Sequence, residues 1–280
     1  MHHREELLVG ERKVLVGAWS PGEYFVPNWS LKPVRNQNDV SQGNAELQRL
    51  TRGLRYAFFD MDMHRAYAPK IVPPSGKITD VRSLTERIRL DEEMYLHRGK
   101  DSADGVRLAV DDGFMASLGG CGLVVAAGGQ QVLVAHAALD SLIHPEVAMG
   151  KKSIEKEPGI VNAMVDWFLE RAVPTEEISM CMLFAIPAMA YKRQFNHPTF
   201  GPYNTALWKL ISNRWPSGAA RRNGNMFLNL ENLFLEQARQ RGVRNVRTKL
   251  SLAELPDLTH TYTTTGNPNV RYLAVVKRCS

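Results

Sequence analysis

Apolar and polar residues alternate with two different periods along the chain, and these periods mark the expected elements. Apolar residues recur at helical spacing over residues 45–54, 159–171 and 229–241, so that one face of each segment is hydrophobic. Short apolar runs typical of strands occupy residues 14–18, 178–186 and 272–276, and strand signals dominate residues 106–137. The pattern predicts a mixed α/β fold with central packed β-sheets flanked by helices.

Less regular segments lie between these elements. A short apolar segment begins at Phe58 and ends near His64, and a charged helix is expected over residues 81–94 with Asp80 as its cap. Clusters of Pro and Gly predict loops over residues 20–43 and 69–76. The chain shows neither an internal repeat nor a linker-like change of composition, so residues 1–280 are expected to form a single domain.

Two apolar runs between residues 120 and 137 carry the first sign of chemistry. The turn signal Gly128-Gly129-Gln130-Gln131 separates them, so they are expected to pair as an antiparallel hairpin. Such pairing brings Cys121 and His136 together at the open end of the hairpin. A thiol beside an imidazole suits a nucleophile with its base, or two thirds of a soft metal site. The plain structural interpretation is a core cysteine and a hydrogen-bonded histidine.

Composition narrows the class of protein. With 44% hydrophobic and 23% charged residues, the chain has the composition of an ordinary globular protein. It has neither an apolar run of eighteen residues nor a secretory N-terminus, so we expect no membrane span and a cytoplasmic location. The three widely spaced cysteines do not form a disulfide framework.

The net charge of +6 is the remaining global feature. Its densest cluster, over residues 239–249, follows an expected amphipathic helix and can be a solvated face. Alternatively the charge attracts an anionic, nucleotide-like small-molecule substrate. Few aromatic residues accompany it and no nucleic-acid-binding motif is present, so nucleic acid is an unlikely partner.

The order of segments resembles the bacterial laccase-domain family, also called the peptidoglycan editing factor family, which shares its fold with the cytotoxic necrotizing factor catalytic domain. Six further segments, distributed over nearly the whole chain, are similar to that family: residues 22–28 with Asn28, 37–44, 104–106, 136–140, 185–191 with Tyr191, and 228–243. Cys121 matches the cysteine of the family's Ala-Asp-Cys motif, and Arg271 is left at a later family arginine. The resemblance implies that Asn28, Tyr191 and Arg271 contact substrate.

The same resemblance implies a metal site, usually zinc, formed by Cys121, His136 and one earlier histidine. His64 is the expected third ligand because it follows the first helix at the right distance, and His97 is the alternative. Three such ligands leave a fourth position open for water or substrate. Copper is less expected, because one cysteine and two histidines cannot form a multicopper array.

The chain also departs from the family pattern. Gly120 replaces the aspartate before the cysteine, and Leu139-Asp140 replaces Trp-Arg. Loss of fixed arginines removes bidentate contacts to anions. The fifteen-residue step from Cys121 to His136 is the spacing of the necrotizing-factor glutamine deamidases, which use the cysteine as nucleophile without a metal.

These observations leave three hypotheses. In the first, a Cys/His site that holds zinc catalyses hydrolytic or phosphorolytic attack on a purine nucleoside or an amide-containing metabolite. In the second, Cys121 and His136 form a metal-free glutamine deamidase, which acts on a protein substrate. In the third, the fold is retained as a non-catalytic binding domain.

Overall fold

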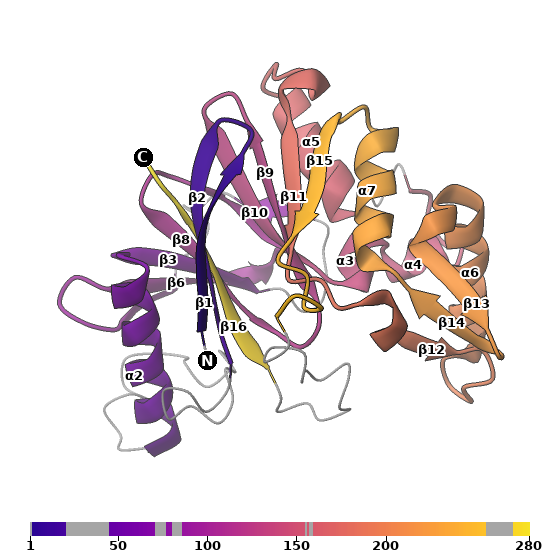
Figure 1. Ribbon diagram of the computed structural model, residues 1–280, viewed down its shortest axis with the longest axis horizontal. Helices are drawn as coiled ribbons and strands as arrows, with labels where there is room; N and C mark the ends of the chain where they lie inside the picture. The colour runs from indigo at the N-terminus through magenta and orange to yellow at the C-terminus, as the bar shows by residue number, and fades with distance from the viewer. Residues whose placement is uncertain are drawn as a thin grey trace.

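Two β-sheets face each other and enclose the main core (Figure 1). The structure is a computed structural model that describes residues 2–20, 45–70, 77–79, 86–154, 156, 159–255 and 271–280. The first sheet has the order β1 (His2–Val9), β2 (Arg12–Trp19), β16 (Tyr272–Arg278), β8 (Asp112–Leu118), β3 (Arg65–Lys70), β6 (Tyr95–Ser102), β5 (Glu86–Arg89). The second has the order β15 (Asn245–Lys249), β11 (Ser179–Leu183), β9 (Gly122–Gly128), β10 (Gln131–Ala137), β7 (Gly105–Leu108), β4 (Ile78–Thr79).

Helices cover the outer faces of both sheets (Figure 1). α2 (Ala45–Asp60) packs on the first sheet and forms a second apolar cluster with the outward residues of β3, β8 and β16. The second sheet is covered by α3 (Leu139–Leu142), α5 (Ile160–Leu169) and α7 (Leu230–Gln240). None of the helices in the described ranges is long and apolar enough to cross a membrane.

A smaller layer extends the second sheet at one end of the molecule (Figure 1). It contains α4 (Pro145–Ala148), α6 (Gly201–Arg214) and a small antiparallel sheet of β12 (Lys192–Gln194), β14 (Asn225–Leu228) and β13 (Ala219–Arg222). Within this layer, the 3-10 turn η3 (Ala188–Ala190) precedes β12 and η4 (Pro216–Gly218) joins α6 to β13, whereas η2 (Thr175–Glu177) lies between α5 and β11 of the second sheet. One continuous core runs from Leu7 to Val276 and includes residues of both large sheets and this layer, so the elements form one α/β domain.

The strongly periodic segments fold as their sequences predict. The apolar runs at residues 14–18 and 272–276 lie in β2 and β16, and residues 106–137 supply β7 to β10. The run at residues 178–186 forms β11 over Ser179–Leu183 and continues beyond it as buried loop. The expected helices at residues 159–171 and 229–241 are α5 and α7, and the side chain of Asn229 caps α7. The prediction of a mixed α/β fold with central sheets is confirmed.

Two expected elements are wrong. Phe58 and Phe59 do not start a new segment, because α2 continues to Asp60 with Phe58 buried against the first sheet. The charged helix expected over residues 81–94 is replaced, in its described part, by strand β5, which pairs with β6. Among the β5 side chains whose burial is described, those of residues 87–89, Ile88 is fully buried between two exposed arginines, so an inward apolar residue anchors a strand whose charged neighbours suggest a helix.

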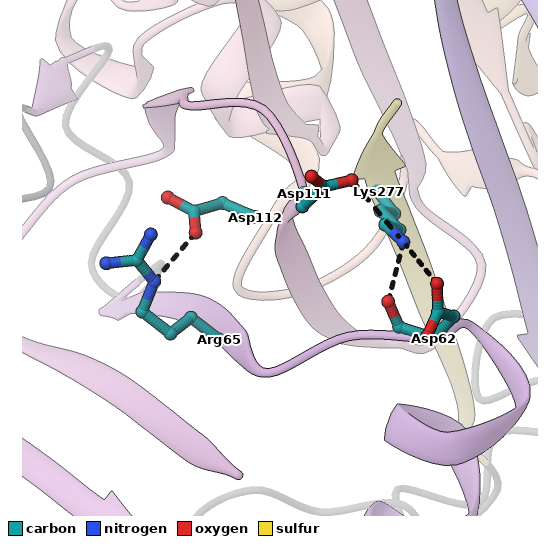
Figure 2. Close-up of polar contacts among 5 residues, drawn as sticks. All are labelled: Asp62, Arg65, Asp111, Asp112 and Lys277. Atoms are coloured by element: carbon teal, nitrogen blue, oxygen red, sulfur yellow. Dashed lines mark hydrogen bonds and ion pairs between the residues drawn. The ribbon is translucent and has the colours of Figure 1, made fainter. Parts of the chain in front are cut away.

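Hydrogen bonds and ion pairs hold the connection between α2 and β3 against β8 and β16 of the first sheet (Figure 2). Lys277 is nearly buried, and its Nζ donates to the backbone oxygen of Asp62 at 2.6 Å and faces the carboxylates of Asp62 at 3.3 Å and Asp111 at 3.6 Å. Beside it, Arg65 Nε lies 2.9 Å from Asp112 Oδ1. These contacts fix the start of β3 against the start of β8.

Candidate active site

The β9–β10 hairpin forms as predicted and brings Cys121 and His136 to its open end. His136 lies directly opposite Leu123, and Cys121 immediately precedes Gly122, the first residue of β9, which pairs with Ala137. The tight passage from β8 into β9 requires Gly120, whose φ of +114° is a conformation that side chains exclude. Sequence and register thus bring the thiol and the imidazole to the same end of the second sheet.

Hydrogen bonds hold the backbone around both side chains. The Tyr272 hydroxyl lies 3.0 Å from the carbonyl oxygen of Cys121, and it also contacts the carbonyl oxygen of Phe184. The amide of His136 donates to the carbonyl oxygen of Asp104 at 2.8 Å. The buried Asp104 carboxylate accepts a hydrogen bond from Ser141 in α3. The site is therefore built where β10, α3 and β16 meet.

The imidazole of His136 is buried and incompletely bonded. The residue is 7% exposed, and its Nδ1 has no hydrogen-bond partner among the described residues. Burial, together with the positive charge of Arg271, lowers the pKa of His136 from 6.5 to about 4. The ring is therefore neutral at pH 7 and has a nitrogen available to a proton or a ligand.

The thiol of Cys121 is partly accessible to solvent but is not ionised. Burial raises its pKa from 9.0 to about 11, and the charge of Asp140 adds to this rise, whereas Arg271 opposes it. At pH 7 the pair consists of a neutral thiol and a neutral imidazole. Nucleophilic attack by sulfur therefore requires transfer of the thiol proton as the bond forms.

Polar residues of the smaller layer lie beside this pair. Tyr191, which the sequence singles out, follows η3, and its buried hydroxyl accepts a hydrogen bond from Arg193 Nη2 at 3.2 Å. The Tyr203 hydroxyl of α6 donates to Asp140 Oδ1 at 3.1 Å. Asp140 acts electrostatically on Cys121, Tyr191 and Arg193, so these groups share one electrostatic environment.

The structure therefore brings four of the expected site residues into one environment. Arg271 acts electrostatically on both Cys121 and His136, and Cys121 acts on Tyr191, around the open end of the hairpin. Asn28 lies outside the described residues. Asp140, Arg193 and Tyr203 were not predicted as site residues, because they come from three segments separated in sequence. The departure at Leu139-Asp140 was the one signal that pointed to this position.

The structure does not bring His64, the expected third metal ligand, close to Cys121 and His136. His64 precedes β3 and is largely exposed, with Glu93 4.0 Å away. β3 pairs in parallel with β8 so that Arg65 is opposite Asp112, whereas Cys121 follows the other end of β8. That strand alone spans roughly 20 Å. His64 is therefore at the far end of the first sheet.

His97 does not complete the metal site either. It is level with Tyr67 on β6 and its ring packs against the Tyr67 ring, with centroids 5.3 Å apart. In the described ranges no three His, Cys, Asp or Glu side chains form a group that could hold a metal ion. Cys121 and His136 supply two donors, so the described residues do not fit the three-ligand zinc site that the resemblance implies.

Comparison with known proteins identifies the fold. No family model and no curated protein matches the chain. One similar solved structure is the hypothetical protein YfiH of Bacillus licheniformis, with a TM-score of 0.65 and 14% identity over 94% of this chain and 92% of that one. NMB0706 of Neisseria meningitidis, a DUF152 protein, has a TM-score of 0.62 and 16% identity over 96% of this chain and 94% of that one. YlmD of Geobacillus stearothermophilus has a TM-score of 0.64 and 14% identity over 95% of this chain and 92% of that one. The chain has the laccase-domain fold that its sequence resembles.

The low pKa of His136 gives a testable pH dependence. Since its folded pKa is about 4 and its unfolded value is 6.5, the unfolded chain binds more protons between these values. The free energy of unfolding therefore does not depend on this group above pH 6.5. As the pH drops from 6.5 towards 4, the free energy of unfolding falls by about 3 kcal/mol in total. NMR titration of the ring should show no protonation at pH 5.5. A midpoint near 6.5 would contradict the buried environment described above.

Proposed function

We propose that this chain is a divergent laccase-domain enzyme in which Cys121 and His136 carry out hydrolytic attack at a C–N bond of a small polar metabolite. The substrate class is an amide-containing metabolite or a purine nucleoside. One observation carries the proposal: at the open end of the β9–β10 hairpin, a partly accessible thiol precedes β9, and the neighbouring strand β10 carries a buried imidazole with one nitrogen that has no partner among the described residues. A cysteine and a histidine placed only for packing would not require an unpartnered polar atom.

The pair works as a nucleophile with its base. As sulfur attacks the substrate carbon, the thiol proton of Cys121 passes to the neutral imidazole of His136. Arg271 lowers the pKa of the thiol and so favours the thiolate that develops during attack. The same cation lowers the pKa of the imidazole, so the protonated ring readily returns its proton to the leaving group.

No step of this mechanism passes through a metal ion. Zinc binding is favoured by the sequence resemblance, whereas the donor set of the described residues supports a pair that acts without metal. A third ligand from residues 256–270, which include His260, would change this conclusion. Metal content is therefore the decisive measurement between the first two hypotheses.

We expect turnover to survive removal of metal. The purified full-length chain, dialysed against a chelator, should release ammonia from adenosine or from glutamine-containing peptides at an unchanged rate. About one equivalent of zinc per chain, lost together with activity on chelation and absent from Cys121→Ser, would overturn the metal-free mechanism. If neither compound class loses ammonia with or without zinc, the hydrolytic function itself is wrong and a binding domain remains.

A further inference from the structure

Asp140 introduces a negative charge at the edge of the candidate active site. It lies in the first turn of α3, three residues after the end of β10, and the Tyr203 hydroxyl donates to its Oδ1 at 3.1 Å. The other carboxylate oxygen of Asp140, Oδ2, makes no hydrogen bond with the described residues. A partly buried carboxylate held by a single hydroxyl retains free acceptor positions, and these suit a ligand that carries N–H donors.

The arrangement of charges around Cys121 is asymmetric. Asp140 acts on the thiol as a negative charge, whereas Arg271 acts as a positive charge. Arg193 lies near Asp140, but its guanidinium also donates to the buried hydroxyl of Tyr191. A ligand at Cys121 therefore meets both a hydrogen-bond acceptor, Asp140, and a cation, Arg271, which fits a substrate that presents N–H groups together with a carbonyl or anionic group.

We propose that the Asp140 carboxylate binds the leaving nitrogen of the substrate, so that the reaction is hydrolytic release of ammonia from a primary amide or an amino-substituted ring rather than phosphorolysis. This inference rests on the proposed function of Cys121 and His136. A carboxylate at this position accepts hydrogen bonds from an NH2 group and repels inorganic phosphate, the co-substrate that phosphorolysis requires.

A primary amide is hydrolysed in two stages, formation of a thioester on Cys121 and its hydrolysis. Sulfur of Cys121 bonds to the amide carbon while His136 takes the thiol proton. The C–N bond breaks, the nitrogen takes that proton and ammonia leaves, and a thioester remains on Cys121. Water then attacks the thioester carbon, gives one proton to His136 and releases the carboxylic acid, after which His136 returns the proton to the sulfur. On an amino-substituted ring, the ring carbon bonds to sulfur as ammonia leaves, and water then displaces the sulfur by the same proton transfers and leaves an oxo group on that carbon. The ionised acid is repelled by Asp140, which favours product release.

A pair of alkylating reagents tests this inference at Cys121 without a known substrate. Iodoacetamide and iodoacetate have nearly the same shape and leaving group, but one carries a primary amide and the other a carboxylate. Each reaction forms one S–C bond and releases iodide and a proton. The ratio of the two rates at Cys121, measured by peptide mass spectrometry, cancels any change in thiol ionisation that both reagents share.

We expect iodoacetamide to be favoured at Cys121 in the natural chain, and this preference should fall about tenfold in Asp140→Asn, which removes the charge with little change in volume. Tyr203→Phe, which removes the hydrogen bond that orients Asp140, should lower the preference by a smaller factor. Cys279 provides an internal reference, and Asp91→Asn, which changes a half-exposed carboxylate in the turn between β5 and β6, is the matched control. The rate ratio at Cys279 should be the same in all variants, and Asp91→Asn should leave the ratio at Cys121 unchanged.

An unchanged ratio in Asp140→Asn, with the folded state verified by circular dichroism, would overturn the role of Asp140. Protection of Cys121 by inorganic phosphate in the natural chain would overturn the exclusion of phosphorolysis. Neither result decides the proposed function, because ammonia release that depends on Cys121 is measured separately. If the natural chain releases no ammonia but still prefers iodoacetamide at Cys121, the proposed function is wrong while the effect of the Asp140 charge remains.

Discussion

Replacing Cys121 with serine is expected to lower the rate of ammonia release by at least about 100-fold. The loss follows because serine has a much higher pKa than the thiol, and the neutral His136 is a weak base with a pKa of about 4. Steady-state assays of the full chain with adenosine or glutamine-containing peptides measure the effect. His136→Asn should cause a loss of similar size, since it removes the group that accepts the thiol proton.

Two controls make this result specific. Cys279→Ser makes the same chemical change at another partly exposed cysteine, near the opposite end of β16 from Arg271, and should keep full activity. The double variant Cys121→Ser/His136→Asn should be no slower than the slower single variant, because the two groups act in one step. Additive losses would show that the side chains act independently, against the mechanism proposed for the pair.

Replacing Gly159 with alanine is expected to lower the free energy of unfolding by about 3 kcal/mol or more. Gly159 caps the start of α5, and a Cβ there would lie 1.9 Å from the carbonyl oxygen of Leu142 in α3. The clash is with backbone, so it cannot be relieved by rotating a side chain. The same carbonyl accepts a hydrogen bond from the buried Gln237 of α7, so displacement also disturbs that contact.

Gly150→Ala is the matched control for this prediction. Gly150 has a φ of +69°, but nothing lies within 4 Å of an added Cβ. Alanine there should cost only backbone strain, about 1 kcal/mol. Denaturant midpoints at constant m-value give both numbers. Equal midpoints for the two variants would show that α3 and α5 are not packed as closely as described.

The fold was predictable where the sequence pattern is local. The β9–β10 hairpin is specified by two apolar runs and a glycine turn, and α5 and α7 each present one regular apolar face. α6 was missed because its described buried residues are few, with Leu207 and Ile211 as the buried apolar side chains in a polar helix. β5 was missed because, over its described side chains at residues 87–89, the buried Ile88 stands between two exposed arginines.

The candidate site was predictable only along the hairpin. Cys121 and His136 are related by strand register, which the sequence determines through the turn between them. His64 was assigned by its distance along the chain, but the parallel pairing of β3 with β8 determines which end of the sheet it occupies. Asp140, Arg193 and Tyr203 meet through packing of separate elements, and a single sequence contains no local signal for such contacts.

The position of β16 inside the first sheet also determines the order in which the strands of this sheet can assemble during synthesis. β16 is the last strand along the chain, yet it pairs with β2 on one side and β8 on the other. The amino-terminal hairpin of β1 and β2 therefore has no attachment to β8 through the sheet until residues 272–278 have been synthesised. Because Arg271 precedes this strand and Tyr272 begins it, a nascent chain cannot assemble the surroundings of Cys121 until β16 has entered the sheet.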